Sequence, residues 1–252
     1  MLVDAEKIRY SRQILLADDG SDVQNKLKAA KVLVAGAGGL GSPLLAYLAA
    51  AGVGHIGIID DDMVDLSNLQ RQLIHDTDKI GEYKVFSAQE SIDRINPHIQ
   101  VETWPTTLKL SNCEAIIKQY DIVAVAVDNF STRSIINKCC INHHIPQIYG
   151  AAVGFEGYVG IFKPWLDNLP CFRCLVPHKP TELAAQTEAE VGVSPTLCGI
   201  IGTMQANEVI RELIQLDFID YHQIHWVNVR NLSFKTIKIE KNPQCPTCGH
   251  LK

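Results

Sequence analysis

A glycine-rich turn at residues 36–41 is the part of this sequence that most directly indicates chemistry. Its pattern, Gly36-x-Gly38-x-x-Gly41, follows an apolar run at residues 31–35 and precedes a segment with helical spacing. Glycines at these positions allow a tight turn and let the backbone approach a phosphate group, whose charge favours the start of a helix. The setting predicts nucleotide binding. The alternative is a tight turn that holds no ligand.

Polar residues after this turn suggest that the nucleotide is a substrate that reacts at its phosphates, rather than a dinucleotide cofactor. Asp60 follows the apolar run 55–59, where a carboxylate can accept hydrogen bonds from ribose hydroxyls; the alternative is an Asp that caps a loop. Arg71 then offers a rigid fork to phosphate oxygens, and Lys84 a compact charge. Alone, each cation would indicate a surface charge. Together with Asn68, and after a nucleotide turn, they favour an enzyme that reacts at the phosphates.

A second functional carboxylate is expected at the same edge of the sheet. Asp128 follows the apolar run 122–127, and ligands bind at the carboxyl ends of parallel strands. Its carboxylate could hold Mg²⁺, which prefers carboxylate and phosphate oxygens. The alternative is a cap for the helix that follows, and both roles can hold together. Asp61 and Asp62, in contrast, are expected to be solvated.

Half of the eight cysteines form two Cys-x-x-Cys pairs about seventy residues apart, Cys171/Cys174 and Cys245/Cys248. Four thiolates suit a closed tetrahedral zinc site. The sequence therefore predicts a structural Zn²⁺ that links the carboxyl-terminal tail to the body of the protein. A thioredoxin-like redox pair is the alternative, but the βαβ setting that such a pair needs is lacking.

Two further residues could be functional but have a plainer interpretation. Cys198 precedes a helix, where the pKa of a thiol can be lowered, but its neighbours are apolar, so we expect a buried structural cysteine. His75 has no metal-ligand spacing to another histidine, and we expect it at the surface or in the core.

The order of the elements predicts the fold class. Apolar runs predict strands at residues 31–35, 55–59, 100–104, 122–127 and 146–149, with helical segments between them. This alternation is typical of an α/β fold: a Rossmann-like, mostly parallel sheet with helices on both faces. Residues 157–162 and 224–239 alternate like antiparallel strands, with a turn at Asn231. They predict an antiparallel carboxyl-terminal extension that carries the zinc site.

Helices are expected at residues 4–17 and 199–213, and a mobile loop at 177–193. The net charge of −5 gives no general attraction to nucleic acid or to an anionic membrane. No apolar run is long enough to span a bilayer, and the first residues lack a secretory signal. We therefore expect a cytoplasmic protein that binds neither nucleic acid nor membrane.

These residues together resemble the ThiF/MoeB/HesA family of ATP-dependent adenylyltransferases, which activate ubiquitin-like sulfur-carrier proteins and are related to ubiquitin-activating enzymes. The resemblance covers nearly the whole chain. Besides the glycine turn, Asp60 and the cysteine pairs, it rests on Arg9-Tyr10-Ser11-Arg12-Gln13, Ser67-Asn68-Leu69-Gln70-Arg71-Gln72, Gly81-x-x-Lys84, Asp128-Asn129 and Gly150-Ala151-Ala152.

The resemblance implies a role for each matching position. Gly39 would lie in the phosphate turn, Asp60 would hold the ribose, and Asp128 would hold Mg²⁺. Arg12 would reach into the site of a partner subunit, which makes a homodimer part of the mechanism. The expected nucleotide-binding set is Gly39, Asp60, Ser67, Asn68, Leu69, Gln70, Arg71, Lys84, Asp128 and Asn129, and the expected catalytic set is Arg12, Arg71, Lys84 and Asp128.

The implied reaction joins the carboxylate of a sulfur carrier for molybdopterin or thiamine synthesis to AMP. Residues 1–252 would form one domain, with amino-terminal helices at 1–30, a nucleotide-binding core at 31–150 and a carrier-binding, zinc-linked part at 151–252. Family members that link covalently to their carrier place a cysteine in a crossover loop, where this chain has Glu188. A thioester or persulfide link through that loop is therefore not expected. No rhodanese-like domain is seen in the sequence either, so a separate protein is expected to donate sulfur.

Two other functions are compatible with a glycine-rich turn. An NAD-dependent oxidoreductase would share the turn but would leave Asn68, Arg71 and Lys84 without a role. A non-catalytic scaffold that binds a nucleotide and a partner is the other alternative. Carrier-dependent release of pyrophosphate distinguishes the adenylyltransferase from both.

Overall fold

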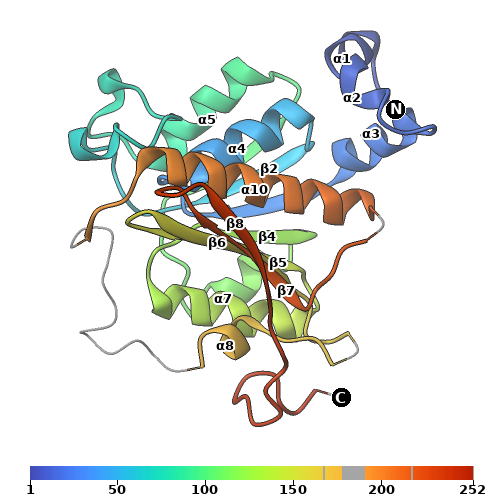
Figure 1. Ribbon diagram of the computed structural model, residues 1–252. Helices are drawn as coiled ribbons and strands as arrows, with labels where there is room; N and C mark the ends of the chain where they lie inside the picture. The colour runs from blue at the N-terminus through green and yellow to red at the C-terminus, as the bar shows by residue number, and fades with distance from the viewer. Residues whose placement is uncertain (167, 178–190, 217, 252) are drawn as a thin grey trace.

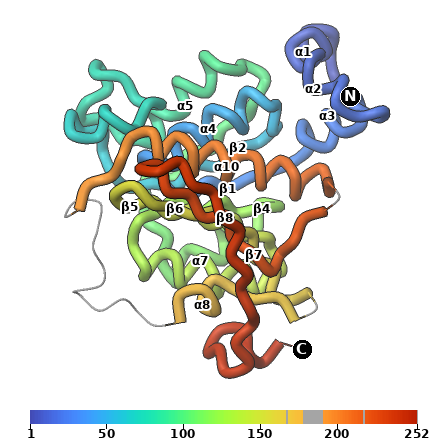
Figure 2. The backbone as a smooth tube through the Cα atoms, in the orientation of Figure 1, coloured from blue at the N-terminus to red at the C-terminus, as the bar shows by residue number. Residues whose placement is uncertain are grey.

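A single mixed sheet runs through the computed structural model, which describes residues 1–166, 168–177, 191–216 and 218–251 (Figures 1 and 2). The strand order is β3-β2-β1-β4-β5-β6-β7-β8. The strands are β1 (Lys31–Ala35), β2 (His55–Ile59), β3 (Gln100–Trp104), β4 (Ile122–Val125), β5 (Gln147–Val153), β6 (Glu156–Phe162), β7 (Gln223–Asn228) and β8 (Ser233–Lys238). The α/β class and the antiparallel extension predicted from the sequence are confirmed.

The parallel half of the sheet consists of β3, β2, β1, β4 and β5. Its central strands are short apolar runs that are buried on both faces, as parallel strands covered by helices should be. Two predicted boundaries differ from the structure. β4 ends at Val125, and β5 continues to Val153 because it pairs with β6 along its whole length, as far as Val153 opposite Glu156.

The second half of the sheet is antiparallel, from β5 through β6 and β7 to β8. The predicted turn at Asn231 joins β7 to β8. The Asn231 side chain accepts hydrogen bonds from the Ser233 amide at 3.2 Å and from the Ser233 hydroxyl at 2.5 Å. An asparagine that bonds to the backbone two residues later stabilises such a turn locally.

Helices cover both faces of the sheet (Figure 1). They are α1 (Asp4–Arg9), α2 (Ser11–Ile14), α3 (Gly20–Ala29), α4 (Gly41–Ala51), α5 (Lys84–Ile95), α6 (Cys113–Ile117), α7 (Phe130–His143), α8 (Phe172–Leu175) and α10 (Pro195–Ile214), with 3₁₀ turns η1 (Leu66–Asn68) and η2 (Thr77–Lys79). One apolar core joins the sheet to α4, α5 and α10, and a second joins it to α6, α7 and α8. No described helix is long and apolar enough to cross a lipid bilayer.

The helix predicted at residues 4–17 differs from the structure in two respects: the chain breaks at Tyr10 into α1 and α2, and α2 already ends at Ile14. The Tyr10 ring is buried, and its hydroxyl accepts a hydrogen bond from the Asn96 side chain at 2.8 Å. A β carbon on Gly52 would lie 2.6 Å from this ring. The helix is thus interrupted at the residue whose side chain is buried against Gly52 and Asn96, although the spacing of the segment predicts one continuous helix.

The long helix α10 packs directly on α4. It begins with Pro195, a residue that is tolerated in the first turn of a helix. At Gly202 the two helices touch so closely that a β carbon would lie 2.3 Å from the carbonyl oxygen of Leu40. The side chain of Gln205, one turn later, donates to the Val125 carbonyl at the end of β4. α10 therefore supports the start of α4 and the end of β4 from one face of the sheet.

Gly202→Ala should lower the free energy of unfolding by about 1–3 kcal/mol, as overpacking does. This cost exceeds the gain in helix propensity of about 1 kcal/mol. Gly199→Ala is the matched control, because nothing lies within 4 Å of the added β carbon on the same helix. It should stabilise the protein slightly. Urea denaturation measures both effects, and equal effects would contradict the close packing of α10 on α4.

Candidate active site

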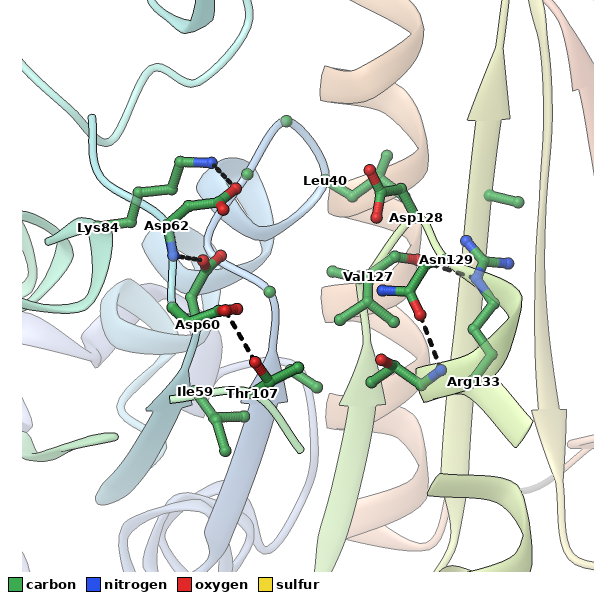
Figure 3. Close-up of a pocket in the computed structure, with 18 of the residues that line it drawn as sticks. Leu40, Ile59, Asp60, Asp62, Lys84, Thr107, Val127, Asp128, Asn129 and Arg133 are labelled. Carbon is green, nitrogen blue, oxygen red and sulfur yellow. Dashed lines mark hydrogen bonds and ion pairs between the residues drawn. The ribbon is translucent and has the colours of Figure 1, made fainter. Parts of the chain in front are cut away.

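A cavity of about 990 Å³ opens at the carboxyl ends of β1, β2 and β4. β2 lies on one side of β1 and β4 on the other. The connections therefore diverge at this point, which is where open α/β sheets bind ligands. Figure 3 shows two walls, one with Asp60 and Lys84, the other with Asp128 and Arg133, and the glycine turn between them.

The glycine turn has the shape that the sequence predicts. Gly36 has φ +100°, and a β carbon there would lie 2.7 Å from the Ala126 carbonyl oxygen. A β carbon on Gly41 would lie 2.1 Å from the carbonyl oxygen of Gly36. Only glycine meets both demands. Helix α4 begins directly after the turn, so its amino-terminal end points at the cavity, where an anion is favoured.

Asp60 ties the turn to the loop that follows β2. One carboxylate oxygen accepts from the Ala37 amide at 2.7 Å and the other from the Asp62 amide at 2.9 Å. Burial raises the pKa of the Asp60 carboxyl, while the positive charge of Lys84 and the two amide donors oppose that rise. Asp60 lines the cavity, as predicted for a residue that holds a ribose.

Lys84, the first residue of α5, is held by an aspartate. Its ammonium group lies 2.8 Å from a carboxylate oxygen of Asp62, and its side chain is only 6% exposed. The Lys84 amide also donates to the Asp62 carbonyl. Asp61 accepts from the Thr107 hydroxyl at 2.8 Å. The prediction that Asp61 and Asp62 are merely solvated is therefore incomplete: both are exposed, but each has a partner at the cavity.

The polar segment 67–72 contributes only part of its predicted set. Asn68, Arg71 and Gln72 line the cavity, at the i, i+3, i+4 spacing that puts side chains on one face of a helical turn. Ser67, Leu69 and Gln70 are not among the lining residues. The Ser67 amide and hydroxyl instead donate to Asp65, which caps η1, and the Ser67 carbonyl accepts from Arg71 at 3.2 Å.

The opposite wall carries the predicted aspartate. Asp128 lines the cavity, and the described residues offer its carboxylate no hydrogen-bond or ion-pair partner. The cap of α7 is Asn129, whose side chain accepts from the Thr132 amide at 2.8 Å, so Asp128 is not needed for capping. Asn129 also lines the cavity, as predicted.

Sequence reasoning missed several lining residues. Arg133 resembles a surface cation, but its guanidinium donates to the Val127 carbonyl at 2.9 Å and to the Gly150 carbonyl at 3.0 Å. Thr107 lies in the loop after β3, where no periodic pattern marks it. If Asn129 had been recognised as the cap of α7, Arg133, four residues later, would have been placed near the start of this helix and thus beside the strand ends.

The other predicted residues lie as follows. Gly39 lines the cavity, and a β carbon there would be 3.1 Å from the Cys198 sulfur. Cys198 is fully buried in the first turn of α10, which confirms the core assignment. Arg12 is exposed on α2 and is not among the residues that line the cavity. Glu188 and most of the predicted loop lie outside the described residues.

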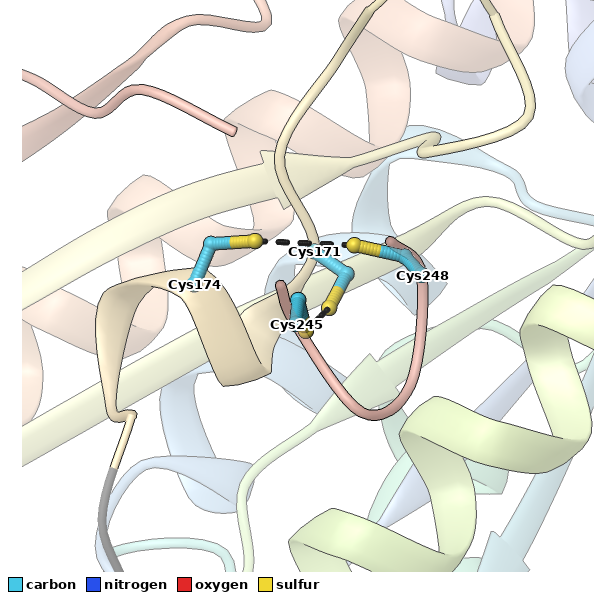
Figure 4. Close-up of side chains that lie close together, drawn as sticks. All are labelled: Cys171, Cys174, Cys245 and Cys248. Carbon is cyan, nitrogen blue, oxygen red and sulfur yellow. Dashed lines mark hydrogen bonds between the residues drawn. The ribbon is translucent and has the colours of Figure 1, made fainter. Parts of the chain in front are cut away.

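The two Cys-x-x-Cys pairs meet at a second site (Figure 4). All four sulfur atoms lie within 4.8 Å of one another. The Cys171–Cys245 sulfurs are 3.7 Å apart and the Cys174–Cys248 sulfurs 3.5 Å apart. Hydrogen bonding from Cys171 and Cys248 lowers the pKa of the Cys174 thiol. The group can hold a metal ion.

The thiol geometry fits a tetrahedral metal better than a disulfide. Sulfur atoms bonded to each other are about 2 Å apart, whereas sulfurs around a tetrahedral ion with bonds of about 2.3 Å are about 3.8 Å apart. The observed separations of 3.5 and 3.7 Å are close to the second value.

Known proteins are similar in sequence to this chain over nearly its whole length. The sulfur carrier protein adenylyltransferase of Thermus thermophilus is 38% identical over 244 residues, 96% of this chain and 90% of that protein. The molybdopterin-synthase adenylyltransferase of Escherichia coli is 38% identical over 98% of each chain. The adenylyltransferase and sulfurtransferase MOCS3 of Culex quinquefasciatus is 40% identical, and this chain spans 56% of its length.

The fold also occurs in a solved structure. Escherichia coli MccB, crystallised with ATP, superposes with a TM-score of 0.83 at 23% identity, over 96% of this chain and 75% of that chain. At this identity the likeness concerns the fold alone.

The sequence itself identifies the family. Residues 10–247 match the sequence model of the ThiF family. The chain therefore belongs to the ThiF family.

Proposed function

We propose that this chain is an ATP-dependent adenylyltransferase that activates the carboxyl-terminal carboxylate of a ubiquitin-like sulfur-carrier protein. The observation that carries the proposal is the convergence of the glycine turn, Arg71, Lys84 and Asp128 on one cavity. A dinucleotide oxidoreductase needs the turn but not the two cations. The names of the ThiF relatives, sulfur carrier protein and molybdopterin-synthase adenylyltransferase, support the same activity.

The reaction is a substitution at the α-phosphorus of ATP. A carboxylate oxygen of the carrier forms a bond to this phosphorus, and the bond to the bridging oxygen breaks, so that pyrophosphate leaves with the electron pair. The products are acyl-adenylate and pyrophosphate. The carboxylate is already ionised at neutral pH, so no general base is required. Catalysis then consists of positioning and of neutralising charge on the phosphates.

Each wall of the cavity has its own part in this scheme. The amino-terminal end of α4 and the amides of the glycine turn receive phosphate oxygens, and Asp60 holds the ribose. Asn68 orients the triphosphate, while Arg71 and Lys84 neutralise its charge. Asp62 keeps the Lys84 ammonium at the cavity until the phosphates arrive. The carrier tail must enter between these groups and Asp128.

Asp128 is the residue that would hold Mg²⁺. Its carboxylate lies at the cavity on the wall opposite Lys84 (Figure 3), and carboxylate plus phosphate oxygens suit this cation. The ion, when bound, would neutralise charge on the triphosphate oxygens. In this role Asp128 would hold the cation at the wall of the cavity that faces Lys84.

The four cysteines are assigned to a structural Zn²⁺. A four-thiolate site with no open position holds a metal in place rather than doing chemistry with it. Cys174 lies in α8 and Cys171 directly precedes it, while Phe172 at the start of α8 and Val176 just after its end line the active-site cavity. The metal would therefore fix the carboxyl-terminal tail and one rim of the cavity together.

A homodimer is part of the proposal, because Arg12 is exposed on α2 and lies away from the lining residues of its own chain. The same amino-terminal segment presents large apolar side chains to solvent: Ile8 in α1 is 76% exposed, and Leu16, two residues after α2, is 85% exposed. Large exposed apolar side chains can mark an interaction surface. We infer that this surface packs on a second copy and delivers Arg12 to its cavity. A separate protein then supplies sulfur to the acyl-adenylate.

Asp128→Asn should reduce carrier-dependent ATP–pyrophosphate exchange by about a hundredfold or more, as the loss of one charge-stabilising group typically does. Asp93→Asn removes a carboxylate from the exposed face of α5 and serves as the matched control, with activity unchanged. Circular dichroism checks that both variants fold. Near-normal exchange in a folded Asp128→Asn protein would remove this residue from the mechanism.

Protein purified without chelator should contain one zinc ion per chain by elemental analysis. Cys248→Ser should lose the metal and several kcal/mol of folding free energy, because metal binding is coupled to folding. Cys113→Ala, which changes a buried cysteine outside the cluster, should keep the full metal content. A fully stable, metal-free wild-type protein would rule out the structural zinc.

Mixing two inactive variants, Arg12→Ala and Asp128→Asn, should restore about a quarter of the wild-type exchange if Arg12 acts across the dimer. Half of the dimers then contain one of each chain, and each of these has one complete site. Subunits must be exchanged by mild denaturation and refolding before the assay. If Arg12 serves its own chain, no mixture recovers activity, and a monomer in sedimentation analysis would contradict the dimer itself.

A further inference from the structure

Both polar groups of the Ala37 backbone, at the centre of the glycine turn, are held by side chains. The amide donates to Asp60 at 2.7 Å. The carbonyl oxygen lies 2.9 Å from Nε2 of His75, a residue that is only 5% exposed. The function proposed above uses Asp60 but gives His75 no part.

The carbonyl contact determines the direction of the next amide. A trans peptide is planar, so its C=O and the following N–H point in opposite directions. Holding the Ala37 carbonyl toward His75 therefore points the Gly38 amide away from His75. Ser42 does the same one residue later, because its amide and hydroxyl donate to the Gly38 carbonyl at 2.9 and 2.8 Å.

The two amides that result have no acceptor in the protein. Within the part of the chain that the structure describes, neither the Gly38 nor the Gly39 N–H donates a hydrogen bond. Both residues line the cavity beside the start of α4. Amides that lie free in a cavity at a helix start are donors for an anion.

The contacts of His75 also fix its protonation. A carbonyl oxygen can only accept, so Nε2 carries a proton and donates it. Nδ1 then accepts from the Ser87 hydroxyl at 2.9 Å, and Ser87 is itself buried on α5, one turn after Lys84. Burial lowers the pKa of His75, so the neutral ring is favoured. The ring thus connects α5 to the glycine turn.

We propose that His75 is a positioning residue for nucleotide binding: its Nε2–H holds the Ala37 carbonyl so that the Gly38 amide faces the polyphosphate. This inference rests on the proposed function, since it concerns the same cavity. It differs from a purely structural role, because the bond orients a donor to the ligand. Ser91 provides the contrast: its buried hydroxyl donates to the Ile74 carbonyl at 2.6 Å, and Ile74 is not among the residues that line the active-site cavity.

The test compares two amides that replace different ring nitrogens. His75→Gln places a side-chain N–H near the former position of Nε2, so it can still donate to the Ala37 carbonyl. His75→Asn places its side-chain amide near the former position of Nδ1, so it can reach only Ser87. The affinity for a non-hydrolysable ATP analogue is measured by calorimetry without carrier, and the free energy of unfolding by urea. Ser91→Ala is the control for loss of a neighbouring buried hydrogen bond.

His75→Asn should weaken analogue binding by about tenfold, the equivalent of one hydrogen bond to a charged group. His75→Gln should bind within about twofold of wild type, and Ser91→Ala should bind normally even though it is less stable. If the Asn protein proves too unstable, Ser87→Ala, which removes the partner of Nδ1, should still weaken binding measurably.

Equal affinities of the Gln and Asn proteins, or losses that track stability in all variants including Ser91→Ala, would overturn the inference. Because analogue binding is measured without carrier, this experiment tests the role of His75 independently of the proposed adenylyltransferase activity. A wild-type chain that binds the analogue but exchanges no pyrophosphate would overturn the adenylyltransferase activity, and the affinities would still decide the role of His75.

Discussion

The chain can leave β1 at Gly36 only because this residue has no side chain. Its backbone is in the left-handed region and lies against the carbonyl of Ala126, just past the end of β4. Any β carbon would force β1 and β4 apart at their carboxyl ends. The close approach sets the width of the cavity between its two walls, and it places the start of α4 at the bottom of that cavity. The position of Asp128 relative to the turn follows from it, while Asp60 is held at the turn by the Ala37 amide.

Much of this arrangement could be predicted because it depends on local patterns. Short apolar runs predict the parallel strands, and an aspartate directly after such a run, as at Asp60 and Asp128, must lie at the ligand-binding edge. The two Cys-x-x-Cys pairs are expected to lie together in the fold, because a tetrahedral zinc site needs four ligands and each pair supplies two. In each case the spacing alone carries the information.

The rest could not be predicted because it depends on contacts between distant segments. From the sequence, Asp62 is expected to be solvated, because nothing there shows that the Lys84 ammonium group forms an ion pair with its carboxylate. His75 looks like any core histidine until its distance to Ala37 is known. The difference at Ser67, Leu69 and Gln70, which are not among the residues that line the cavity, is of another kind. Their helical turn presents one face to the cavity, and a count at helical spacing would have put Asn68, Arg71 and Gln72 on that face.

The helix α10 has a consequence for the order in which the protein can be completed. It is made after residue 194, yet it packs on α4 at the Leu40 carbonyl and bonds to the end of β4 through Gln205. A growing chain folds from its amino terminus as it leaves the ribosome. The glycine turn therefore emerges long before the helix that supports it, and α4 exposes its apolar side to solvent in the meantime. The interval before α10 arrives is therefore the time when this apolar surface is open to chaperones or to aggregation.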